Sequence, residues 1–281
     1  MQIGVNGVSV NYALEGPGDA PCVTFCHSLA CDLTMWDEQA ELLRGRYRVL
    51  RYDVRGHGGS EATKGAYTFD MLSDDVAALW DGLGIEQSHW VGLSLGGMIG
   101  FGLALRHPAR MLSMTACDTR ADAPPAYADL FAGRIRVTRE QGLEAMVWPT
   151  ITRWFTEKSL AEKLPAVEKI SDMIRHTHPE GHIGCCEAIR NLSYGVRLSE
   201  VRVPTLILVG AEDAGAPPEI MEGIHKAIPG SRYVLIPGAG HISNVENPVA
   251  FNAAIKEFLG KQRAVSRPPE SQTQAESSHR K

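Results

Sequence analysis

A serine lies at the centre of the run Gly92-Leu93-Ser94-Leu95-Gly96, between an apolar stretch and a segment with a helical pattern. A serine hydroxyl becomes an effective nucleophile when it is exposed and paired with a base. Glycines on both sides let a strand turn sharply into a helix, which exposes the hydroxyl. A Gly/Ser turn without function can match these five residues, but the flanking strand and helix patterns favour a catalytic serine. We therefore expect Ser94 to be the nucleophile of a serine hydrolase.

The nucleophile needs a base, and His241 has the best sequence context among the ten histidines. It ends the loop Pro237-Gly238-Ala239-Gly240-His241, which follows an apolar strand pattern. His27 also follows a strand, and we expect it to shape the neighbouring loop, whereas His57 lies in a glycine-rich turn and is predicted to be structural. Three further histidines lie close together in the sequence, at positions His176, His178 and His182. Their spacing fits no standard zinc pattern, so we predict no metal site.

A carboxylate must hold the base in the correct tautomer, and two aspartates follow strand patterns at suitable places. Asp213 follows the strand pattern at 206–209, and Asp118 follows the one at 111–117. Either aspartate preserves the chain order serine, acid, histidine that is typical of α/β-hydrolases. The turn Gly210-Ala211-Glu212-Asp213 favours Asp213, and Asp118 remains the alternative.

An oxyanion formed during acyl transfer needs two hydrogen-bond donors. The backbone N–H of the residue after the nucleophile, Leu95, is one expected donor. The second should come from the loop after the strand at 22–26, where Leu29 is the candidate.

Strand and helix patterns alternate along most of the chain. A hairpin is predicted around Asn6-Gly7. Further strands are predicted at 22–26, 47–52, 89–91, 111–117, 206–209 and 232–236, and helices at 35–43, 71–83, 98–105, 218–228 and 249–259. This alternation indicates an α/β fold, with a mostly parallel sheet and helices on both faces.

The alternation stops between residues 123 and 197, where the pattern is helical and interrupted by prolines. We predict that this segment is a helical cap inserted into a core formed by residues 1–122 and 198–260. Ligands of open α/β sheets bind at the carboxyl ends of the strands, where such a cap would lie. Residues 261–281 are polar and rich in Ser, Gln, Glu and Pro, so we expect a disordered tail.

Composition narrows the class of protein. The 281 residues are 44% hydrophobic with a net charge of −5, and no basic block suggests a nucleic-acid partner. No signal peptide and no membrane-spanning run are predicted. The six cysteines show no disulfide or zinc spacing, so we expect a cytoplasmic protein with reduced thiols. The sequence does not define an oligomeric state.

Motifs as far as about Leu259 resemble those of α/β-hydrolases, and among them the 3-oxoadipate enol-lactone hydrolases. The superfamily motifs surround Ser94 and His241, together with Ser28-Leu29, Arg51-Tyr52-Asp53 and Arg55-Gly56-His57-Gly58. Three narrower motifs are Cys117-Asp118-Thr119, Trp154-Phe155-Thr156 and Gly184-Cys185-Cys186, of which two lie in the predicted cap. The usual glycine after Ser-Leu is replaced here by Ala30.

The resemblance implies that Ser94, Asp213 and His241 form a catalytic triad that opens a small enol-lactone to 3-oxoadipate through an acyl-enzyme. It implies no metal and no cofactor. The lactone's acetate arm needs a cation, for which Arg134 in the cap is the first candidate, and Trp148 and Trp154 are candidates for the substrate wall. Alternatives are a carboxylesterase or lactonase for other small esters, a cofactor-independent perhydrolase, and a catalytically silent receptor of the same fold.

Overall fold

The computed structural model describes residues 1–266, within which eight strands form one sheet in the order β1-β2-β4-β3-β5-β6-β7-β8. Strands β3 to β8 run parallel to one another, and β2 is antiparallel to both of its neighbours, β1 and β4. The strands are β1 (Gln2–Val5), β2 (Val8–Glu15), β3 (Cys22–Cys26), β4 (Arg48–Tyr52), β5 (Ser88–Leu93), β6 (Met111–Cys117), β7 (Thr205–Gly210) and β8 (Arg232–Ile236). The predicted mostly parallel sheet is confirmed.

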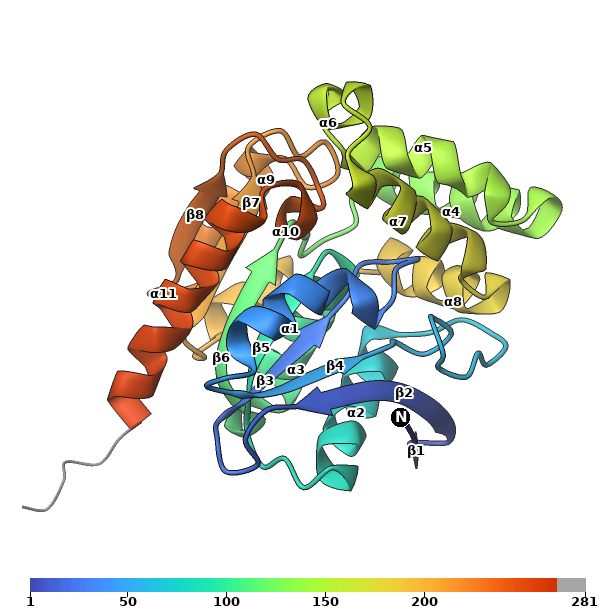
Figure 1. Cartoon of the computed structure of the whole chain (residues 1–281). Helices are drawn as coiled ribbons and strands as arrows, with labels where there is room; N and C mark the ends of the chain where they lie inside the picture. The colour runs from blue at the N-terminus through green and yellow to red at the C-terminus, as the bar shows by residue number, and fades with distance from the viewer. Residues whose placement is uncertain (267–281) are drawn as a thin grey trace, which may run out of the picture.

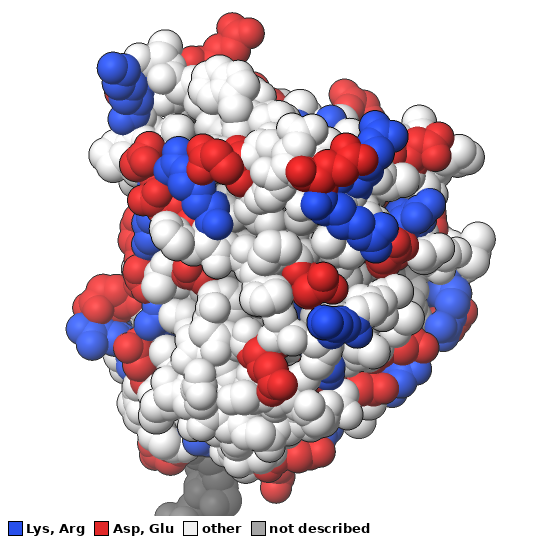
Figure 2. Space-filling model, turned by 90° about the vertical axis from the view of Figure 1, so that its right-hand side faces the viewer, with Lys and Arg blue, Asp and Glu red and all other residues white. Residues whose placement is uncertain are grey.

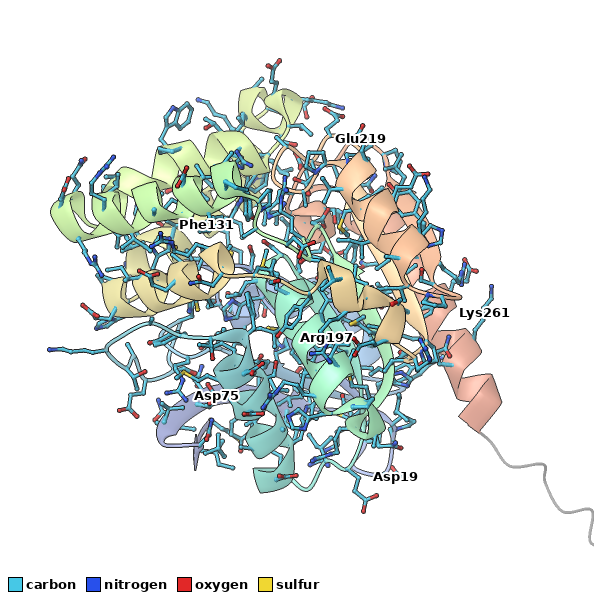
Figure 3. The ribbon with its side chains drawn as sticks, turned by 180° about the vertical axis from the view of Figure 1, so that it is seen from behind. Asp19, Asp75, Phe131, Arg197, Glu219 and Lys261 are labelled. Atoms are coloured by element: carbon cyan, nitrogen blue, oxygen red, sulfur yellow. The ribbon has the colours of Figure 1, made fainter. Side chains whose placement is uncertain are left out.

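Helices cover both faces of the sheet. Figure 1 shows α1 and α11 in front of the sheet, and the reverse view in Figure 3 shows α2 and α9 on the other face. The bounds are α1 (Asp37–Leu43), α2 (Phe69–Gly82), α3 (Leu95–Arg106), α9 (Pro218–Ala227) and α11 (Pro248–Ser266). Every residue of β3, β5 and β7 is buried, as expected for strands covered on two sides.

The predicted hairpin forms between β1 and β2. Asn6 and Gly7 have φ angles of 46° and 76°, the left-handed conformation that a two-residue hairpin turn requires. This hairpin extends the sheet with its two antiparallel strands.

Five consecutive helices, here named the cap helices, lie between β6 and β7 in the described chain. They are α4 (Pro125–Gln141), α5 (Glu144–Trp154), α6 (Glu157–Ala161), α7 (Pro165–His176) and α8 (Pro179–Arg190). Figure 1 shows them together beyond the arrowhead end of β6, with α4 against α8 and α5 against α7. The cap helices therefore cover the carboxyl end of the sheet.

Several boundaries differ from the sequence prediction. The short elements η1 (Leu33–Trp36), η2 (Pro108–Arg110), η3 (Gly195–Glu200) and α10 (Ser243–Glu246) were not predicted as separate elements. Helix α11 continues to Ser266, so the tail predicted from Lys261 begins inside a helix. Residues 267–281 lie outside the described residues.

Charges of both signs are interspersed on the face shown in Figure 2. All six cysteines lie in the described part of the chain, where they are buried and unpaired. Within residues 1–266, no helix combines the length and the apolar character that crossing a membrane requires.

Candidate active site

Ser94 lies at a sharp turn between β5 and α3, with φ 55° and ψ −108°. A side chain at Gly92 would place its Cβ 2.2 Å from the carbonyl oxygen of Gly96, and one at Gly96 would lie 2.3 Å from that of Cys26. Only glycine therefore fits at these two positions. The two glycines of the motif allow the strand and helix to approach each other closely enough to expose the serine hydroxyl.

The unusual backbone of Ser94 is held from strand β6. Its N–H donates to the carbonyl of Cys117 at 2.8 Å, and its own carbonyl accepts from the Thr119 hydroxyl at 2.7 Å. A strained residue persists when its surroundings fix it from several directions. These two bonds fix the backbone of Ser94 and therefore the position from which its side chain projects.

Ser94, His241 and Asp213 form a hydrogen-bonded line across the ends of β5, β8 and β7. Ser94 Oγ lies 2.9 Å from His241 Nε2, and both carboxylate oxygens of Asp213 lie 2.9 Å from Nδ1. A carboxylate can only accept, so Nδ1–H donates to Asp213 and Nε2 is left to accept from the serine hydroxyl. Such a tautomer can remove the serine proton during nucleophilic attack.

Asp213 is held as a carboxylate. Burial raises its pKa, but the charge and hydrogen bond of His241, together with the N–H groups of Ala216 and Gly215, outweigh burial and lower the pKa below its usual value. The two N–H groups donate to Oδ1 at 3.0 and 2.6 Å. The result is a fixed negative charge beside the imidazole.

Asp118, the alternative acid, has different partners. It accepts from the N–H of Gly210 at 2.7 Å and from the hydroxyl of Ser243. Burial, and secondly the charge of Asp213, raise its pKa well above the usual value. The structure therefore brings Asp213, and not Asp118, to His241.

The two predicted oxyanion donors lie beside the serine. Leu29 lines the pocket that contains Ser94 and His241, and its N–H has no acceptor among residues 1–266. Leu95 is the first residue of α3, so its N–H has no acceptor within the helix. Ala30 has φ 57°, a left-handed conformation that glycine adopts without strain, which explains why a glycine is usual there.

The pocket around Ser94 is narrow and is closed by the cap helices. Its free volume is about 20 Å³, and its lining includes Tyr127, Phe131, Arg134, Arg153, Trp154 and Ile189. The Trp154 ring centroid lies 5.6 Å from that of His241, and the Trp154 carbonyl accepts from the His241 N–H at 2.8 Å. Trp154 therefore lines the pocket beside His241, and its role as a substrate wall stays a prediction.

Arg134 is a buried cation in the same wall. It donates to the Thr150 hydroxyl at 3.2 Å, and its guanidinium lies 5.6 Å from the centroid of the Phe131 ring. Burial lowers its pKa, and no carboxylate pairs with it in the described residues. A buried cation without a counter-ion favours an anionic ligand.

Trp148 does not lie where it was predicted. Its side chain is 69% exposed on the outside of α5, and it is not part of the pocket lining. Trp148 and Trp154 are six residues apart, so they point about 120° apart around a helix of 3.6 residues per turn. With Trp154 directed at His241, Trp148 is directed away from the site, and its assignment to the substrate wall is wrong.

Sequence reasoning did not find Tyr127, Phe131, Arg153 or Ile189. Tyr127 and Phe131 carried a usable signal, because they lie at the i, i+4, i+7 spacing of one helical face with Arg134, which was already a candidate. Arg153 is adjacent to Trp154 and offers no comparable pattern. Ile189 reaches the site from α8, a contact that only the packing of α8 on α4 creates.

The other histidines have structural partners. His27 is fully buried, with Nε2 accepting from the Val54 N–H at 2.9 Å and Nδ1–H donating to the Ser28 carbonyl at 2.7 Å. It therefore shapes the loop that carries Leu29. His182 is bonded to Thr138, and across the described residues no group of three or more His, Cys, Asp or Glu side chains is arranged to hold a metal ion.

Comparison with known proteins identifies the family of the chain. Residues 21–248 match the α/β hydrolase fold family. 3-Oxoadipate enol-lactonase 2 of Acinetobacter baylyi is 36% identical, over 90% of this chain and 93% of that protein. The crystal structure of the enol-lactonase from Burkholderia xenovorans matches with a TM-score of 0.89 and 36% identity, over 92% of this chain and 100% of that chain.

A thermophilic esterase from Thermogutta terrifontis, whose structure was determined with malate bound, matches with a TM-score of 0.89 and 31% identity, over 93% of this chain and 99% of that chain. The matches cover nearly all of the chain up to the end of α11. The chain therefore belongs to the α/β-hydrolase fold family, and it is a hydrolase similar over most of its length to the 3-oxoadipate enol-lactonases.

Proposed function

We propose that the protein is a serine hydrolase of carboxylic esters, and that its substrate is the enol-lactone of 3-oxoadipate. The observation that carries the first part is the continuous line of hydrogen bonds from Asp213 through His241 to the hydroxyl of Ser94. This arrangement matches the roles of acid, base and nucleophile in acyl transfer.

In the proposed reaction, Ser94 Oγ attacks the lactone carbonyl while His241 Nε2 takes the hydroxyl proton. The negative charge that develops on the carbonyl oxygen is stabilised by the N–H groups of Leu29 and Leu95. The ring C–O bond then breaks, the enol oxygen receives the proton from His241, and an acyl-enzyme remains. Water activated by His241 hydrolyses the acyl-enzyme, and the released enol tautomerises to the ketone of 3-oxoadipate.

The substrate assignment rests on two observations. Two relatives and one solved structure, 31% to 36% identical to this chain, are named enol-lactonases, which makes a lactone the first choice. Arg134 is a buried cation that lacks a carboxylate partner within residues 1–266, so the acetate arm of the lactone can supply the missing anion. The malate-bound esterase, also similar to this chain, shows that this fold can be crystallised with a small dicarboxylate.

A second candidate is an esterase for other small esters, favoured by the 31% identity to the Thermogutta terrifontis esterase. Both candidates use the same three residues. They differ in whether the substrate must carry an anionic arm for Arg134.

The six buried, unpaired cysteines fit a reducing compartment, so we also propose that the protein acts in the cytoplasm.

The test is a comparison of kcat/KM for 3-oxoadipate enol-lactone, neutral lactones of the same ring size, and p-nitrophenyl acetate. We expect the enol-lactone to be preferred by at least about tenfold, the effect of one charge-assisted hydrogen bond. Equal values for charged and neutral substrates would replace the enol-lactone by the general esterase. Absence of turnover on every ester and lactone would refute the serine-hydrolase proposal itself.

A further inference from the structure

A second, larger space lies between cap helices α4 and α5. It is a groove with a free volume of about 600 Å³, compared with about 20 Å³ for the pocket around Ser94. The apolar side chains of its lining are Leu130, Val137, Ala145, Met146 and Pro149. The polar residues of its lining are Asp129, Arg134, Arg136, Gln141, Thr152 and Arg153. The groove extends from Asp129 to Gln141 along α4, which is roughly 18 Å at 1.5 Å per residue.

The groove and the catalytic pocket share a wall. Leu130, Arg134 and Arg153 line both spaces, so these three side chains separate Ser94 from the groove. A substrate arm that is too long for the small pocket would find its nearest free volume in the groove. The groove and the catalytic pocket are therefore adjacent, and only side chains of α4 and α5 lie between them.

The three wall residues differ in how firmly they are held. Arg134 is 8% exposed and hydrogen-bonded to Thr150. Arg153 is half-buried and makes no hydrogen bond, ion pair or ring contact with any described residue. Leu130 is 37% exposed at the surface of α4. A passage from the pocket to the groove can therefore open beside Leu130 and Arg153 by rotation of side chains, while Arg134 stays in place.

We propose that the groove between α4 and α5 binds an unbranched aliphatic acyl chain, and that the protein hydrolyses medium-chain acyl esters in addition to small lactones. The chain runs from the acyl carbon at Ser94, past Leu130 and Arg153, along the apolar side chains of Val137 and Met146. This inference rests on Ser94 as the nucleophile, but not on the enol-lactone as substrate. Each methylene buried in the groove raises affinity by about fourfold.

A substitution at Gly133 can fill the groove and so test whether the groove binds substrate. It lines the groove from α4, and a Cβ built on it meets no atom within 4 Å. A larger side chain there enters the groove without displacing the helix. Gly133→Phe fills the space, and Gly133→Ala is the matched control that adds only the Cβ.

The experiment measures kcat/KM for p-nitrophenyl acetate, hexanoate and octanoate, so that the leaving group stays constant. For the wild-type protein we expect octanoate to exceed acetate by at least about tenfold. Gly133→Phe should lower the octanoate value at least about tenfold while acetate hydrolysis is retained, and Gly133→Ala should follow the wild type. Arg153→Ala, which widens the passage, should raise the ratio of octanoate to acetate.

Two results would overturn the groove assignment while leaving Ser94 as the nucleophile. One is acetate hydrolysis by the wild type without octanoate hydrolysis. The other is a Gly133→Phe protein that loses both activities equally or neither. Absence of acetate and octanoate hydrolysis together with intact enol-lactone turnover overturns the acyl-chain inference alone. Absence of all three activities overturns the proposed function as well.

Discussion

The ends of the strands and the cap helices contribute to the candidate site in different ways. Ser94, Asp213 and His241 come from three short loops at the carboxyl ends of β5, β7 and β8, and hydrogen bonds from backbone N–H groups fix each of these loops. The cap side chains around the pocket come instead from α4 and α5, with Ile189 from α8. Under the proposed function, the ends of the strands supply the reacting groups and the cap helices supply the contacts that select the substrate.

The two regions also carry opposite charge. At the strand ends the charged group is Asp213, surrounded by N–H donors and His241. In the cap it is Arg134, with a hydroxyl and an aromatic ring as partners but no carboxylate in the described chain. The strand-end charge is satisfied within the protein, whereas the cap charge is available to a ligand. Mutations in the two regions should therefore affect different kinetic constants.

The largest effect should come from Ser94→Ala at the strand ends. Removing the nucleophile of a serine hydrolase lowers kcat by about six orders of magnitude. The turn should persist, because the bonds that hold it come from backbone atoms of Ser94 and from Thr119. Steady-state kinetics and the thermal unfolding midpoint measure the two properties separately.

Substantial turnover by a folded Ser94→Ala protein would show that another group attacks the substrate. Covalent labelling by a fluorophosphonate provides a second readout, since labelling of the wild type should disappear in the variant. Labelling that persists would move the nucleophile elsewhere.

The second effect separates the two aspartates. Asp213→Asn should lower kcat by about four orders of magnitude, because an amide no longer fixes the tautomer or stabilises the imidazolium. Asp118→Asn should lower kcat by no more than about tenfold, because the Asn oxygen can still accept from the Gly210 N–H and His241 is not a partner of Asp118. Kinetics of both variants under the same conditions measure the difference. The reverse order would assign the acid to Asp118.

The placement of Ser94, Asp213 and His241 at the ends of strands could be predicted from sequence because each residue lies next to a recognisable local pattern. Ser94 has its two glycines, and Asp213 and His241 follow apolar strands that must end at the same edge of a parallel sheet. Chain order did not separate Asp213 from Asp118. That distinction depends on which carboxylate points at His241, which only the three-dimensional arrangement shows.

The cap was less predictable for a physical reason. A helical pattern predicts that a helix forms, but not which face meets the sheet. The helical pattern does not show whether Trp148 or Trp154 faces the site, and only the rotation of α5 directs Trp154 at His241 and exposes Trp148. The groove depends on the distance between α4 and α5, for which the sequence carries no local signal.

The third effect tests the cap cation. Arg134→Met keeps much of the apolar volume and removes the charge, so KM for carboxylate-bearing lactones should rise about 10- to 100-fold, the value of a charge-assisted hydrogen bond. Substrates without a carboxylate should change much less. The matched control is Arg139→Met, an exposed arginine of α4 that lines neither space. Equal losses on charged and neutral substrates would assign Arg134 a packing role.

The smallest effect concerns the stability of the cap and its dependence on pH. His182 in α8 is buried, and burial, with a further contribution from the charge of Arg134, lowers its pKa to about 3. In the unfolded chain His182 becomes protonated near pH 6.5, whereas in the folded protein it stays neutral down to about pH 3. Stability from this residue is therefore complete above pH 6.5 and falls as the pH decreases.

Between pH 7 and pH 5 this loss amounts to about 2 kcal/mol for a single histidine. His182→Gln removes the titrating group but can still bond to Thr138, so its free energy of unfolding should fall by about 2 kcal/mol less than that of the wild type over this range. His176→Gln is the control, since His176 lies exposed on α7. Urea unfolding at each pH gives the free energy of unfolding of the wild type and of both variants.

Because buried His27 and His57 in the core also have lowered pKa values, some acid sensitivity should remain in every variant. Parallel curves for His182→Gln and the wild type would mean that the acid sensitivity arises in the core, and not in the cap.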